Sequence, residues 1–393
     1  MKTIKKSLIS LSLGGLTIGI TEFVMMGILP DVASDLKVSI PIAGYLISAY
    51  ALGVVIGAPL LVIVARNYPP KKTLLILAGM LAFFNSLSVI VPNYEFFILT
   101  RLLSGLPHGA FFGVGAVVAS RLAEKGKEAQ AISIMFAGLT IANLIGVPIG
   151  TYIGHHLSWR YTFILIGLLG VLTLISLYFW MPDLSSNDRV SMKTQMQLFK
   201  KIEAWLVILI TSIGVGGLFC WISYIAPLLT EISGFDAAYV PYILILAGAG
   251  MVVGNLIGGK LADTFPPDTT LITLFFVMAL DLAMVFLFSY NPYVSLFLVF
   301  STGCVSFMFI ASIQMLMIQI AVGAEMIASA AIQASFNIGN ALGAFLGGLP
   351  LMAGFSYASP NLIGIGMSLM GVLFTVMLVQ RKKSKLKLQT VEI

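Results

Sequence analysis

The chain has 393 residues, of which 59% are hydrophobic and only 10% are charged, and its formal net charge is +6. Soluble domains are about 25% charged, so this composition excludes a soluble protein, which would have to cover its surface with polar side chains. The apolar runs continue for about twenty residues instead of alternating over about ten, which excludes an outer-membrane β-barrel. The sequence therefore predicts an all-α, polytopic membrane protein.

The first apolar segment follows a basic start, MKTIKK, as a signal peptide would. The apolar run continues through Glu22 to Leu29 without a small-residue cleavage site, so we interpret it as a retained first span. Eleven further segments are long enough to cross a bilayer. The twelve expected spans cover residues 7–29, 41–64, 73–91, 95–120, 129–153, 161–181, 205–229, 240–262, 270–289, 293–320, 325–352 and 361–380.

The basic residues of the loops predict the orientation of these spans. An even number of spans places both termini on one side of the membrane. All of the 22 lysines and arginines except Lys37, Arg101 and Arg160 then lie on the side of the termini. The positive-inside rule identifies that side as the cytoplasm. Because the anionic inner leaflet attracts these cations, the net charge requires no nucleic acid as a partner.

Two loop segments reveal an internal repeat. VARNYPPKKT at 64–73 aligns without a gap with LADTFPPDTT at 261–270, an offset of 197 residues. Each follows the second expected span of its half, which is typical of a parallel repeat. The organisation predicted is a six-helix bundle over residues 1–181, a cytoplasmic linker over 182–204, and a second bundle with a short basic tail over 205–393.

Three ionisable residues lie inside the first and fourth expected spans. An ionised carboxylate in contact with lipid costs a few kcal/mol or more, so Glu22 should face the interior of the bundle. At a rise of 1.5 Å per residue, Glu22 and Arg101 both lie roughly 10–12 Å below the outer boundary. His108 lies two turns deeper on the face of Arg101. Either Glu22 and Arg101 form a structural ion pair, or Glu22 exchanges a proton as its distance from Arg101 changes. His108 is a second titratable candidate or a polar packing group.

For three other polar or reactive side chains in the spans, a structural role is favoured over a functional one, and for Asp281 both stay open. Asp281, in the ninth expected span, is expected to be satisfied by a neighbouring helix. Cys220 and Cys304 lie in apolar runs without a cysteine-pair or histidine–cysteine motif, so we expect small buried hydrophobes and no metal. The chain has no nucleotide-binding signature, so no cofactor is expected.

The second half carries an apolar and weakly polar set of residues in its seventh, tenth and eleventh expected spans. Aromatic and methionine side chains adapt to varied apolar ligands, and amides supply hydrogen bonds. The candidate substrate-cavity residues are Trp221, Tyr224, Phe307, Met308, Gln314, Asn337 and Asn340.

Four motifs, in order along the chain, resemble those of the major facilitator superfamily and, more narrowly, its twelve-span drug:proton antiporters near the arabinose-efflux-permease-like exporters of bacteria. The resemblance covers essentially the whole chain. The motifs are TEFVMMGILPDVASDL from residue 21, RLLSGLPHGAFFG from residue 101, GLTIANLIGVPIGTYIG from residue 138, and GGKLADTF from residue 258.

This resemblance implies a fold of two pseudo-symmetric six-helix bundles around a central cavity. The first, fourth, seventh and tenth spans line that cavity in the family, which would bring Glu22, Arg101 and His108 together. We expect these three residues to couple transport to protons.

The same resemblance implies two gating elements. The glycine–aspartate loop motif contains Asp263 in the second half, whereas Arg66 stands near the matching position of the first half. The fifth-helix antiporter motif contains Gly146, Pro148 and Gly150.

The function implied is secondary active export of a small organic molecule, such as a drug, a sugar or a related metabolite, in exchange for protons. A functional monomer is expected, with the substrate, protons and membrane lipid as its partners. The alternatives are a proton-coupled importer or a facilitator on the same fold and, more distantly, an intramembrane enzyme or a non-transporting receptor. The chain lacks the zinc-protease, paired-aspartate and Gly-x-Ser-x-Gly signatures of such enzymes, so we expect that it is not an enzyme.

Overall fold

A computed structural model of the protein describes all residues except 1, 66–67, 125–127, 185–196, 322–324 and 392–393. The described chain consists of helices and their connections, as lipid requires of a spanning backbone that must satisfy its own hydrogen bonds. In chain order the elements are α1 Lys2–Gly27, α2 Leu29–Asp35, α3 Ile40–Ala65, α4 Pro70–Leu87, η1 Ser88–Ile90, α5 Tyr94–Leu122, α6 Glu128–Ile141, η2 Ala142–Gly146, α7 Val147–Ile153, η3 Gly154–Ser158, α8 Trp159–Trp180, η4 Gln197–Lys200, α10 Ile202–Leu209, η5 Ile210–Gly214, α11 Gly216–Ser223, α12 Ile225–Pro227, η6 Leu228–Ile232, η7 Ala237–Tyr239, α13 Val240–Thr264, α14 Pro267–Phe288, α15 Pro292–Ile320, α16 Glu325–Met352 and α17 Pro360–Val391.

The helices match the twelve spans expected from the sequence. Ten described segments are long and apolar enough to cross a membrane. One of them, Ile134–Trp180, covers the fifth and sixth expected spans together, and α16 supplies the eleventh. The all-α polytopic class is therefore confirmed.

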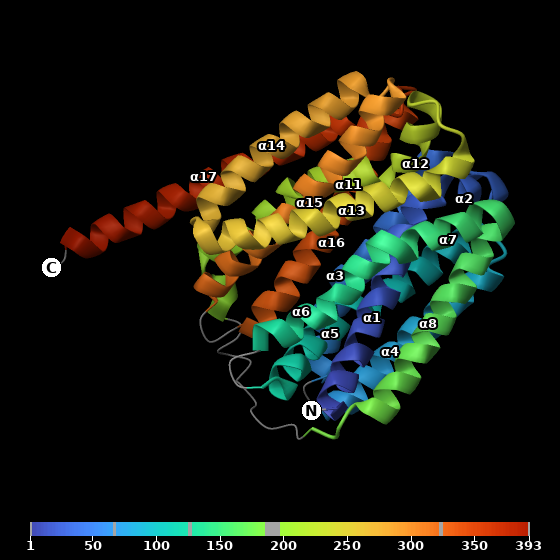
Figure 1. Ribbon diagram of the computed structural model, residues 1–393. Coiled ribbons are helices and arrows are strands. Elements are labelled where there is room, and N and C mark those ends of the chain that lie inside the picture. Colours follow the sequence, from blue (N-terminus) through green and yellow to red (C-terminus); the bar gives the residue numbers. More distant parts are fainter. Residues whose placement is uncertain (1, 66–67, 125–127, 185–196, 322–324, 392–393) are drawn as a thin grey trace.

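The helices form two bundles, the first from α1 to α8 and the second from α10 to α17 (Figure 1). Both termini lie at the same end of the molecule, which we name the termini end. The opposite end, where α2, α7 and α12 lie, is the far end. The boundaries 1–181, 182–204 and 205–393 stay a prediction, since residues 185–196 lie outside the described chain.

Matching glycine contacts hold the second and fourth spans of each bundle together. A Cβ added to Gly105 of α5 would lie 2.1 Å from the carbonyl oxygen of Tyr50 in α3. In the second bundle, a Cβ added to Gly303 of α15 would lie 2.5 Å from the carbonyl oxygen of Ala247 in α13. Such close backbone approach is how small residues pack helices in lipid. The contact recurs at an offset of 197 to 198 residues, in agreement with the repeat found in the loops.

The fifth span is not one regular helix. The sequence predicts a single span over 129–153, but π-helical turns η2 and η3 interrupt it on either side of α7. Pro148 stands in the first turn of α7, where its missing N–H interrupts the helical hydrogen-bond ladder. π-helical turns often mark functional sites in helices, so this span has two points at which its axis can change direction.

The two bundles meet along a seam at the far end. Ser48 of α3 donates a hydrogen bond of 3.1 Å to the carbonyl oxygen of Ala341 in α16. The rings of Tyr45 and Phe345 stack nearby, with centroids 5.8 Å apart. On the other side of the seam, α13 packs against η2 and α7 and diverges from α6 towards the termini end (Figure 1).

Candidate functional site

Arg101 of α5 is fully buried inside the first bundle. Its Nη1 donates hydrogen bonds to the carbonyl oxygen of Thr21 at 2.9 Å and to the Thr21 hydroxyl at 3.3 Å. Its Nε donates to the carbonyl oxygen of Leu46 at 3.4 Å, and its guanidinium carbon lies 4.5 Å from the centre of the Tyr50 ring. Backbone oxygens and an aromatic face therefore hold this cation, in place of a carboxylate.

Glu22 of α1 is 6% exposed and lies at the seam between the two bundles. Its Oε1 accepts a hydrogen bond of 3.4 Å from Nδ2 of Asn340 in α16. Arg101 and Tyr50 lie close enough to Glu22 to interact with it electrostatically. No ion pair within 4 Å joins Glu22 to Arg101, both of which the structure describes. The structural ion pair considered above is therefore absent from this conformation.

Tyr50, which sequence analysis missed, links His108 to Arg101 and Glu22, and we call these four residues the charged cluster. The Tyr50 hydroxyl lies 3.1 Å from Nδ1 of His108, and both side chains are buried. Tyr50 thus contacts His108 with its hydroxyl and Arg101 with its ring. No sequence pattern marks Tyr50, which stands in an ordinary apolar run. The nearest signal is Gly53, three residues later, because glycines on α3 allow α5 to approach closely.

Not all of the candidate substrate-cavity residues of the second bundle contact the charged cluster. Among those that the structure describes, Asn340 is the one with a hydrogen bond to it. Tyr224 donates to the carbonyl oxygen of Ala344 at 2.7 Å and lies at the far-end seam beside Gly44. Trp221, Phe307 and Asn337 are buried, and Met308 and Gln314 are partly buried.

Two of these buried side chains have unused hydrogen-bonding atoms. Nε1 of Trp221 and Oδ1 of Asn337 have no hydrogen-bond partner in the described part of the chain. A buried polar atom without a partner is costly, so these atoms are suited to a ligand or water.

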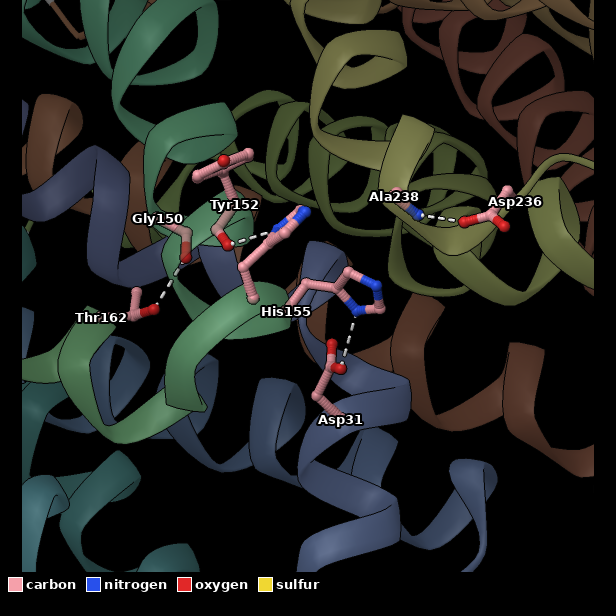
Figure 2. Close-up of polar contacts among 8 residues, drawn as sticks. Asp31, Gly150, Tyr152, His155, Thr162, Asp236 and Ala238 are labelled. Atoms are coloured by element: carbon pink, nitrogen blue, oxygen red, sulfur yellow. Dashed lines mark hydrogen bonds and ion pairs between the residues drawn. The ribbon is translucent and has the colours of Figure 1, made fainter.

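The predicted gating residues of the fifth span pack against α1. A Cβ added to Gly150 would lie 2.7 Å from Cγ2 of Val24 and 3.1 Å from Cγ2 of Thr162. The Thr162 hydroxyl donates to the carbonyl oxygen of Gly150 at 2.7 Å (Figure 2). Gly146 likewise faces Ile20. Arg66 and the side chain of Asp263 lie outside the described residues, so their gating roles stay predictions.

We expect Gly150→Val to destabilise the protein by about 1–3 kcal/mol, because the added methyl groups overlap Val24 and force α1 and α7 apart. Thermal unfolding in detergent measures the effect. Gly366→Val is the matched control, since nothing lies within 4 Å of a Cβ added there. Equal melting temperatures for the two variants would show that the α1–α7 contact is not tight.

Polar contacts fasten α2 to the first bundle at the far end. His155 of η3 and Asp31 of α2 lie 3.0 Å apart between Nδ1 and Oδ1 (Figure 2). Asp35 accepts hydrogen bonds from Arg160 at 2.6 Å and from Trp159 at 3.0 Å. The bond from the Arg160 guanidinium holds the pKa of Asp35 below its usual value. These contacts make the far end of the first bundle one packed unit.

A second aromatic contact crosses the far-end seam. The ring of Tyr152 in α7 lies 6.4 Å from that of Tyr242 in α13, edge to face, and His156 stacks on Tyr152 at 4.1 Å. The Tyr152 carbonyl also contacts His156 Nδ1 at 3.1 Å. Together with Tyr45–Phe345 on the opposite side, this contact closes both sides of the seam at the far end.

Asp281 of α14 accepts hydrogen bonds from Ser301 and Thr302 of α15, as expected for a structural role. Cys220 and Cys304 are free and buried. In the described part of the chain, no group of three or more His, Cys, Asp and Glu side chains could hold a metal ion.

The fold and the buried cluster at the seam define a polytopic membrane transporter. The sequence pattern of the Major Facilitator Superfamily matches residues 11–331. The chain belongs to this superfamily, and it is a transporter and not an enzyme.

Individual relatives and structures agree with that assignment. The putative transporter AraJ of Escherichia coli (strain K12) is 38% identical over 353 residues, which cover 90% of each chain. A probable sugar efflux transporter of Helicobacter acinonychis is 28% identical over 338 residues, or 86% of each chain. The crystal structure of a D-xylose–proton symporter has a TM-score of 0.74 at 18% identity, with 95% of this chain and 97% of that chain covered. At this identity, the likeness to the symporter concerns the fold alone.

Proposed function

We propose that the protein exports a small organic molecule, such as a drug, a sugar or a related metabolite, in exchange for protons. The observation that carries this proposal is the position of Glu22, a buried carboxyl group at the seam of the two bundles that is not neutralised by a direct ion pair. Carboxyl groups inside membrane helices commonly belong to proton pathways.

The proposed cycle uses the two bundles as rigid units. Rocking about the seam would open the far end, separate Glu22 from Asn340 and replace that contact with water. The proton affinity of a carboxyl group depends on its solvation, hydrogen bonds and charged neighbours. Glu22 would therefore exchange its proton with a different side of the membrane in each conformation. Arg101 and Tyr50 would keep their positions beside it, because they belong to the same bundle.

Export is favoured over import by two observations. The segment GLTIANLIGVPIGTYIG resembles the antiporter motif of the fifth helix, and one relative is named a probable sugar efflux transporter. The D-xylose–proton symporter shares the fold, so a proton-coupled importer or a facilitator is the second candidate.

We further propose that the protein works as a monomer in the bacterial cytoplasmic membrane, with both termini in the cytoplasm. The distribution of lysines and arginines among the loops supports this orientation.

The proposal is tested in proteoliposomes with an imposed pH gradient and a panel of labelled sugars and amphiphilic drugs. An exchanger accumulates its substrate when the vesicle interior is acidic, because protons leave as the substrate enters. Accumulation only with an alkaline interior would identify a symporter, and equilibration that ignores the gradient would identify a facilitator. Protein-free liposomes and a protonophore are the controls.

A further inference from the structure

Asn340 is the polar side chain through which the second bundle reaches Glu22. It is fully buried, and its Nδ2 donates to Oε1 of Glu22 at 3.4 Å. Its other amide atom, Oδ1, is buried without a hydrogen-bond partner among the described residues. The next residue, Ala341, accepts the hydrogen bond from Ser48 across the same seam. This turn of α16 therefore contacts both α1 and α3 of the first bundle.

An amide suits both protonation states of a carboxyl group. Its N–H groups donate to an ionised carboxylate, and its oxygen accepts from the O–H of a protonated one. The unpartnered Oδ1 of Asn340 is available for the second arrangement after rotation of the amide. A hydrogen bond to a charged group is stronger than one between neutral groups, so the contact between the bundles changes in strength when Glu22 gains or loses its proton.

The titratable groups that interact with Glu22 belong to its own bundle. Arg101 of α5 and Tyr50 of α3 interact with it electrostatically, and His108 is linked to Tyr50. These residues move with Glu22 when the bundles rock. Asn340 is the polar partner that the described part of the second bundle supplies.

We propose that Asn340 is a positioning residue that makes closure of the far end depend on the protonation of Glu22. The inference rests on the proposed role of Glu22 as the proton carrier and adds the link between that proton and the conformation of the transporter.

Asn340→Leu tests this dependence, because leucine has nearly the shape of asparagine but its side chain can neither donate nor accept a hydrogen bond. Asn361→Leu is the matched control. Asn361 of α17 belongs to the same bundle and is also buried, and its Nδ2 donates to the carbonyl oxygen of Ala358, three residues before it. Its Oδ1, like that of Asn340, has no partner among the described residues. Both variants remove one buried amide, whereas only the first removes a contact between the bundles.

The measurement is the distance between spin labels at Ser34 and Phe355, by pulsed electron spin resonance. These residues line one cavity at the far end from different bundles, and both are exposed. Cys220 and Cys304 are replaced by alanine so that the labels attach only at the chosen sites. The fraction of molecules with a closed far end is recorded between pH 5 and pH 9 for the parent, both leucine variants and Glu22→Gln.

We expect the closed fraction of the parent and of Asn361→Leu to change with pH through the same midpoint. For Asn340→Leu the midpoint should shift by about one pH unit or more, or the dependence should vanish, as for loss of a hydrogen bond to a charged group. A parental profile in Asn340→Leu, or an equal change in Asn361→Leu, would overturn the proposal.

The other variants distinguish the proposed role of Asn340 from the proposed role of Glu22 as proton carrier. A flat profile in Glu22→Gln with a parental profile in Asn340→Leu would overturn only the role of Asn340. A parental profile in Glu22→Gln, or no pH dependence in the parent, would overturn the proposed proton carrier as well. If Asn340→Leu does not fold, Asn340→Thr and Asn340→Val replace it. The hydroxyl of threonine should preserve the pH dependence that valine loses, and equal profiles would reject the inference.

Discussion

Glu22→Gln should abolish proton-driven export while the protein still binds its substrate and exchanges it down a gradient. Glutamine keeps the size of the side chain and an oxygen that can accept from Asn340, but it cannot titrate. Substrate affinity should therefore stay within about threefold of the parent value, the effect of a weakened hydrogen bond. Substrate-induced proton release in detergent and counterflow in proteoliposomes measure the two activities separately.

Glu95→Gln is the control for this variant, since it removes the same charge from an exposed position in the first turn of α5. It should behave as the parent in both assays. If Glu22→Gln released protons on substrate addition as the parent does, the proton carrier would lie elsewhere. His108, which is joined to the cluster through Tyr50, would then be the next residue to test.

Arg101→Met should destabilise the protein by about 3 kcal/mol or more and abolish transport. The change removes the hydrogen bonds that Arg101 donates to the carbonyl oxygens of Thr21 and Leu46, and it removes the positive neighbour of Glu22. Thermal unfolding in detergent and transport in proteoliposomes report the two effects. Arg101→Lys should recover only part of the stability, because an ammonium group lacks the planar fork that reaches both carbonyls.

The double variant Glu22→Gln with Arg101→Met distinguishes a packed cation from half of an ion pair. Because no direct ion pair joins the two residues in this conformation, the coupling between their losses in stability should be smaller than that of a buried ion pair. A double variant that folds better than Arg101→Met alone, with transport restored, would identify a structural ion pair. Arg160→Met, at a half-exposed pair with Asp35, is the control and should cost less than about 1 kcal/mol.

The sequence by itself determined the membrane class, the twelve spans and the repeat. These features depend on local properties: a run of about twenty apolar residues spans a bilayer wherever it occurs. The depth of Glu22 and Arg101 was equally accessible, because the rise per residue of a helix is constant. The placement of α3 against α5 was also within reach, since the glycines that permit it recur at helical spacing.

The tertiary structure decided which groups satisfy these charges. Arg101 is held by backbone carbonyls of α1 and α3, and every chain offers such carbonyls at every position, so no sequence pattern marks the ones used. The π-helical turns on either side of α7 likewise appeared only in the structure, where the sequence predicted one span over 129–153. The contact between Glu22 and Asn340 joins residues 318 positions apart, on different bundles. Such a contact exists only in a conformation in which the bundles meet at the far end. The relative placement of the two bundles is set by the surface that they share and not by the periodicity of either helix.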